Sequence, residues 1–73
     1  MSTQTDAIEK NGYVLIKTEN GSNEFRSWTN YYYSKGDKTL LYNDSDDRLL
    51  VRKNHRCIYE TGIFSKKLNE TLP

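Results

Sequence analysis

A short basic segment, Arg52-Lys53-Asn54-His55-Arg56, has the residue types needed to bind anions. Four of its five side chains are or can become cationic, although the 73-residue chain has a formal net charge of only +1. Arginine presents a planar fork of donors that fits carboxylates and phosphates. Together with Arg48, the segment belongs to a basic region: residues 48–67 hold six basic side chains against one acidic, whereas residues 1–47 hold five against eight. An electrostatic partner is therefore expected to meet the second half of the chain.

A catalytic interpretation of the same region rests on His55 and Cys57. Two positions apart on a strand, a base and a nucleophile could share one face. The pair lies beside a turn, the chain has little room for an enclosed pocket, and no orienting carboxylate is evident, so catalysis is disfavoured. Cys57 is instead expected as a small buried hydrophobe. We predict a protein that is not an enzyme.

Ion and cofactor sites are also not expected. Residues 44–47, Asp-Ser-Asp-Asp, lack the frame and the closing glutamate of a calcium loop. Residues 34–39, Ser-Lys-Gly-Asp-Lys-Thr, lack the frame of a phosphate-binding loop. One cysteine and one histidine cannot close a zinc site. The sequence predicts no cofactor, no metal and no small-molecule substrate.

The aromatic segment at residues 28–33, Trp-Thr-Asn-Tyr-Tyr-Tyr, could build a core or bind a partner. On a strand, Tyr31 and Tyr33 share one face, while Trp28 and Tyr32 share the other. Leu, Ile, Val and Phe number only fifteen, so aromatic rings must supply part of the core. We expect the first pair inside. We expect Trp28 and Tyr32 on the accessible face, where they could anchor a protein or stack bases.

The elements that carry these residues read as an antiparallel β-meander of four to five strands. From residue 12 onward, short runs rich in β-branched and aromatic residues are broken every eight to ten positions by turn residues. Asn20-Gly21 predicts a tight hairpin turn. That turn would pair Lys17 with Glu24 and Ile16 with Phe25.

The basic segment is predicted at the tip of the last hairpin. Residues 39–43, 48–52 and 56–60 read as the third, fourth and fifth strands. A three-residue loop between the last two would place Val51 opposite Cys57 and Arg52 opposite Arg56. Like charges in direct opposition destabilise a sheet, so folding alone does not favour this tip. A bulge or a longer loop is the alternative.

The two ends of the chain read differently from the middle. Residues 1–11 are polar and short, which predicts a flexible, disordered N-terminal arm ahead of a single small β domain at residues 12–73. Phe64, Leu68 and Leu72 recur every four residues, which favours a short C-terminal helix, with an edge strand as the alternative. The lone cysteine, together with the absence of a signal-like start or an apolar span, predicts a cytoplasmic protein with no membrane partner.

In its size, its tyrosine content, its polar start and its lack of an enzyme motif, the chain resembles small bacteriophage regulators that bind bacterial RNA polymerase. The resemblance implies a host cytoplasm, binding to the polymerase, displacement of its initiation factor and altered transcription. It rests on no motif, so it assigns no residue.

Our function hypothesis is a non-enzymatic regulator that binds a larger protein; the alternative is a single-stranded nucleic-acid-binding module. A net charge of +1 weakens the alternative. The partner-binding residues expected in either case are Arg48, Arg52, Lys53, His55, Arg56, Trp28 and Tyr32.

Overall fold

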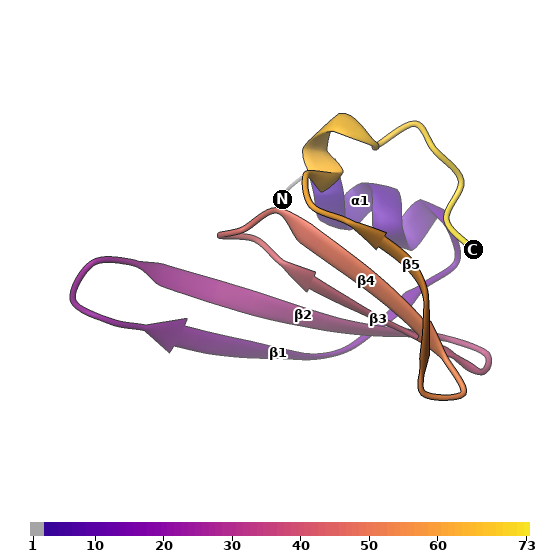
Figure 1. Ribbon diagram of the computed structural model, residues 1–73, viewed down its shortest axis with the longest axis horizontal. Helices are drawn as coiled ribbons and strands as arrows, with labels where there is room; N and C mark the ends of the chain where they lie inside the picture. The colour runs from indigo at the N-terminus through magenta and orange to yellow at the C-terminus, as the bar shows by residue number, and fades with distance from the viewer. Residues whose placement is uncertain (1–2) are drawn as a thin grey trace.

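Five antiparallel strands form one open sheet, and their order in the sheet follows the sequence (Figure 1). This confirms the predicted β-meander. The computed structural model describes residues 3–73; Met1 and Ser2, the start of the expected arm, lie outside the described residues. The elements are α1 (Thr3–Lys10), β1 (Val14–Ser22), β2 (Ser27–Lys35), β3 (Lys38–Asn43), β4 (Arg48–Lys53), β5 (Arg56–Thr61) and the 3-10 turn η1 (Phe64–Lys66).

The core lies on one face of the sheet, where large side chains meet in register. Tyr33, Leu40 and Val51 are cross-strand neighbours on β2, β3 and β4, and all three are buried. Tyr42 and Leu49 form part of the next row. Tyrosine therefore takes the place of missing aliphatics, as the composition predicts. Burial raises the pKa of Tyr33 to about 12, so its hydroxyl stays neutral in the core.

Helix α1 corrects the expected flexible arm over its residues. Ala7 and Ile8 are buried in the core, on the same side of the sheet as the C-terminal segment (Figure 1). Asp6 in the first turn and Lys10 in the last complement the helix dipole. Eight residues are too few for a stable isolated helix. The burial of Ile8 therefore supplies stability that local helix propensity does not.

The β1–β2 hairpin turns later than predicted, so the expected pairs Lys17–Glu24 and Ile16–Phe25 are wrong. The turn spans residues 23–26, where Asn23 Oδ1 accepts the backbone N–H groups of Phe25 at 2.8 Å and Arg26 at 3.0 Å. An asparagine side chain that closes a turn in this way competes with the Asn-Gly turn. Phe25 is consequently 86% exposed at the end of a long hairpin (Figure 1).

Gly21 serves a packing role in β1 rather than a turn. Gly21 lies opposite Trp28 in the sheet. A Cβ atom on Gly21 would come within 2.3 Å of the Trp28 ring. The glycine therefore allows the indole to lie flat across the neighbouring strand. The Asn20-Gly21 pair, which predicts a turn, therefore marks a position where the Trp28 ring approaches the backbone of β1 closely.

The β4–β5 turn is shorter than predicted. Its two central residues, Asn54 and His55, have φ values of 53° and 64°, which is the pattern of a type I′ turn. Lys53 consequently lies opposite Arg56. The predicted opposition of Arg52 and Arg56 is wrong.

A bulge then shifts the register of β5. The two-residue turn has already placed Cys57 opposite Arg52; Ile58 is the extra residue, so Tyr59 lies opposite Val51. Cys57 is exposed, and its expected place in the core beside Val51 is wrong. The shorter turn changes the register at Cys57 by one residue, which reverses the face that its side chain takes, because the side-chain period of a strand is two.

The C-terminal segment forms the single turn η1, which corrects the expected helix. The apolar positions are as predicted, because Phe64 and Leu72 are buried and Leu68 packs against the core. Two backbone groups near the C-terminus bind distant side chains. Leu72 N–H donates to Asn11 Oδ1 at 2.9 Å, and Pro73 C=O accepts from the Tyr13 hydroxyl at 2.7 Å. These tertiary hydrogen bonds satisfy groups that a helix would otherwise pair.

Candidate binding site

The β2–β3 and β4–β5 turns lie at the same end of the sheet (Figure 1). There the register aligns four cationic residues across four strands: Lys35 opposite Lys38, Lys38 opposite Lys53, and Lys53 opposite Arg56. Adjacent strands are about 4.8 Å apart, so the row spans roughly 15 Å. We call Lys35, Lys38, Lys53 and Arg56 the basic row.

The basic row has few counter-charges. Among residues 3–73, the carboxylate that reaches it is Asp37, whose Oδ2 lies 3.6 Å from Lys53 Nζ; both side chains are about half exposed. Lys35 Nζ lies 5.3 Å from the centre of the Tyr13 ring, which stabilises that one cation. Directly opposed like charges destabilise a sheet. The row is a local cost that the fold itself does not require.

A shallow depression lies at the same end of the sheet as the basic row but on the other face, because its strand residues Thr39 and Arg52 alternate with Lys38 and Lys53. Its volume is about 310 Å³, and it is lined by Asp37, Thr39, Arg52, Asn54 and His55. Arg52 is exposed and lies opposite Thr39. The depression therefore brings a guanidinium and an imidazole together between the two turns. We call the basic row and this depression the basic end.

The sheet face opposite the helix is the second part of the site, and we call it the open face. Tyr32, Leu41 and Leu50 form its central cross-strand row. Together with Thr39 and Arg52 they line a second depression of about 150 Å³. Apolar side chains thus lie beside a cation on a surface that α1 does not cover (Figure 1).

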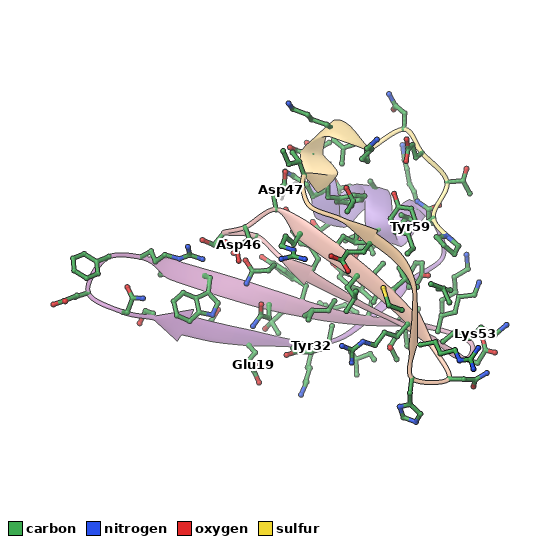
Figure 2. All side chains as sticks on the ribbon, viewed as in Figure 1. Glu19, Tyr32, Asp46, Asp47, Lys53 and Tyr59 are labelled. Atoms are coloured by element: carbon green, nitrogen blue, oxygen red, sulfur yellow. The ribbon has the colours of Figure 1, made fainter. Side chains whose placement is uncertain are left out.

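Tyr32 is held in place by β1. Lys17 Nζ lies 4.7 Å from the centre of the Tyr32 ring. The Tyr32 hydroxyl donates a hydrogen bond to Glu19 Oε1 at 3.2 Å (Figure 2). Partial desolvation, followed by the hydrogen bond and the charge of Glu19, raises the pKa of the Tyr32 hydroxyl. Because Lys17 contacts the ring face and Glu19 binds the hydroxyl, the Tyr32 side chain loses little conformational freedom when a partner covers it.

The residues predicted for partner binding do not all gather in one place. Arg52, Lys53, His55 and Arg56 meet at the basic end, and Tyr32 lies one row away from Arg52 on the open face. Arg48 lies apart, because its guanidinium pairs with Glu60 at 2.6 Å. Its charge is therefore largely used within the protein.

Trp28 belongs to a different surface, on the long β1–β2 hairpin. The Arg26 guanidinium lies 5.7 Å from its ring centre, and Arg26 also pairs with Asp46 at 3.0 Å. The nearby depression, about 370 Å³, is lined partly by Trp28 and Asp44. The charges around Trp28 are therefore mixed in sign, in contrast to those of the basic end.

Lys35 and Lys38 are the site residues that sequence reasoning missed. The signal was present: a cation flanks the β2–β3 turn on each side, as at the β4–β5 turn. Alternate turns of a meander lie at the same end of the sheet. Aligning the two turns would have shown that the charges of both halves of the chain meet.

Comparisons of the chain with protein-family models, with curated proteins and with solved structures find no match. Within residues 3–73, no cluster of three or more His, Cys, Asp or Glu side chains is placed to hold a metal ion. The same residues include no helix with the length and apolar character needed to cross a membrane. The function is therefore argued from the basic end and the open face.

Proposed function

We propose that the protein is a non-enzymatic regulator that binds a larger protein through its basic end and the adjoining open face. The observation that carries the proposal is the basic row, in which four cations lie side by side in register. Among residues 3–73, Asp37 is the carboxylate that reaches it. A partner with acidic groups would relieve the repulsion that the fold leaves in place. The row thus has a physical use in the complex that it lacks in the free protein.

The open face supplies what charge alone does not. Exposed charges mainly raise the association rate and select the partner, whereas buried aromatic and aliphatic groups supply most of the affinity. Tyr32, Leu41 and Leu50 lie beside Arg52, so a partner held by Arg52 could also cover an apolar surface. We assign Tyr32 the role of anchor and the basic end the role of steering.

A protein partner fits the arrangement better than single-stranded nucleic acid. Strand-binding proteins interleave aromatic rings with the cations that track the phosphates. Here Trp28 lies on the β1–β2 hairpin beside Asp44, away from the basic row, and Tyr32 is bonded to Glu19. The rings and the cations do not form one continuous track.

Bacterial RNA polymerase is the first partner to test, because the chain resembles small phage regulators of that enzyme. The experiment measures binding of the purified protein to purified polymerase, and in parallel to a labelled single-stranded oligonucleotide. The variant is Lys38→Glu/Arg56→Glu. Both substitutions place a carboxylate opposite Lys53, so they replace repulsion with attraction within the protein.

The expected result separates binding from folding. The variant should unfold at the same free energy as the wild type or be up to about 1 kcal/mol more stable, while its affinity for the polymerase falls by about tenfold or more. The control, Lys66→Glu/Lys67→Glu, changes the net charge equally but lies near η1. It should bind like the wild type. Undiminished binding of the first variant, or binding of the oligonucleotide alone, would overturn the proposal.

A further inference from the structure

Strand β1 is the long free edge of the sheet. The strand order ends at β1, and every residue of β1 except Gly21 is exposed. Three consecutive apolar residues at its start, Val14, Leu15 and Ile16, are 66%, 43% and 59% exposed. An exposed edge strand with apolar side chains is a template for pairing with another strand.

The charges of β1 are complementary to those of a second β1. Thr18 is the midpoint of the nine-residue strand Val14–Ser22, and Lys17 and Glu19 flank it. Their β2 partners are Tyr32 and Asn30, so both side chains lie on the open face. When two such strands run antiparallel with Thr18 opposite Thr18, Lys17 of each copy faces Glu19 of the other. Twofold symmetry makes this favourable pair twice.

The same charges disfavour neighbouring registers. Centring the pair on Lys17 would oppose two lysines, and centring it on Glu19 would oppose two glutamates. Like charges directly across a sheet are destabilising, and opposite charges contribute about 0.2–1 kcal/mol per pair. The sequence Lys17-Thr18-Glu19 therefore both favours one register and penalises the alternatives.

We propose that two copies of the protein pair through β1, in antiparallel orientation about Thr18, to form one continuous sheet. The nine-residue strand offers about 30 Å of edge. The bulge at Ile16 twists the start of β1, so the pairing is firmest over Lys17–Glu19 and the apolar start is covered alongside residues 20–22 of the second copy. Tyr32 contacts both Lys17 and Glu19, which orders the two side chains before the copies meet.

The other free edge, β5, is less suited to the same role. It has six residues, and its extra residue Ile58 lies in the middle of the strand. Its carboxylate, Glu60, is already held by Arg48 at 2.6 Å. A bulge at the centre of an edge strand prevents regular pairing. The proposal therefore concerns β1 alone.

Sedimentation equilibrium of the purified protein tests the pairing. The wild type is expected to reach twice the 8.6 kDa chain mass as its concentration rises. The variants Lys17→Glu and Glu19→Lys should each remain monomeric, because like charges then oppose each other twice. An equal mixture of the two variants should dimerise, because each new charge faces an opposite one on the other copy.

Mixing the two variants distinguishes a lost interface from a lost fold. A variant that had merely lost its structure would not recover when mixed with another, and circular dichroism of each variant alone checks that β structure is present. The doubly exchanged variant Lys17→Glu/Glu19→Lys should dimerise like the wild type. A wild type that stays monomeric at millimolar concentration overturns the proposal. So does a mixture that stays monomeric, or a Lys17→Glu variant that dimerises normally.

Discussion

Asp47 ties the start of the C-terminal segment to the sheet through three hydrogen bonds. It follows the β3–β4 turn with a φ of 54°. Its carboxylate accepts hydrogen bonds from the Ser65 hydroxyl at 2.6 Å, the Ser65 backbone N–H at 3.0 Å and the Tyr42 hydroxyl at 3.2 Å. Such a constellation requires the charged carboxylate. The aspartate-rich loop at residues 44–47 therefore contains a structural hydrogen-bond acceptor.

These bonds make stability depend on pH. Burial alone would raise the pKa of Asp47, but the hydrogen bonds from Ser65 and Tyr42 outweigh it and lower the pKa below 3.8. A lowered pKa in the folded state stabilises the protein fully above 3.8, and the contribution disappears as the pH falls through the folded value.

We predict that Asp47→Asn lowers the free energy of unfolding by about 1–3 kcal/mol at neutral pH. The difference from the wild type should narrow as the pH falls through the lowered pKa of Asp47. Denaturant unfolding at a series of pH values measures both. The exposed Glu24 of the β1–β2 turn gives the control, Glu24→Gln, which should have little effect at either pH. A deficit that stays constant with pH would contradict the assigned role of the charge.

Helix α1 is an element whose existence depends on the sheet. Ile8 is fully buried, whereas the helix around it is short and mostly polar. The helix, in turn, covers core side chains that the sheet could not shield alone. The two elements are therefore expected to form together, without a stable sheet that lacks the helix.

We predict that Ile8→Ala destabilises the protein by about 2–5 kcal/mol, enough to unfold much of a domain this small. Thermal melting followed by circular dichroism measures the loss. Ile63→Ala removes the same atoms at a position that is 48% exposed rather than 0%, so it should cost well under half as much. Equal effects of the two variants would show that the N-terminal segment does not pack as described.

Charge is divided across the whole molecule. The basic end gathers five cationic side chains and one carboxylate from both halves of the chain. The carboxylates Asp44 and Asp46 lie near the β3–β4 turn, at the other end of the strands. A molecule of nearly zero net charge thus has a strongly oriented field. Net charge alone underestimates how it meets a partner.

We predict that the association rate with the partner falls as the ionic strength rises from about 0.05 M to about 0.5 M, while the dissociation rate changes much less. Surface plasmon resonance resolves the two rates. In the Lys38→Glu/Arg56→Glu variant the dependence on salt should largely disappear. A wild-type association rate that is indifferent to salt would argue against electrostatic steering by the basic end.

Much of the fold followed from the sequence. The alternation of apolar and polar residues predicted four to five short strands and their sequential pairing. It also divided Tyr31, Tyr32 and Tyr33 between two faces, because side chains on a strand alternate whatever the strand packs against. The concentration of Arg52, Lys53, His55 and Arg56 at a turn was likewise visible, since turn position depends on local residues.

Tertiary structure decided the registers and the ends. The bulge at Ile58 places Tyr59 rather than Ile58 opposite Val51, and the contact between Gly21 and Trp28 moves a turn to Asn23. Both depend on what lies across the strand, which local spacing does not record. The segments around Ile8 and Leu72 are fixed by packing against residues far along the chain. The basic row is the same kind of feature: its four cations become neighbours only because the meander folds two separate turns onto one end of the sheet.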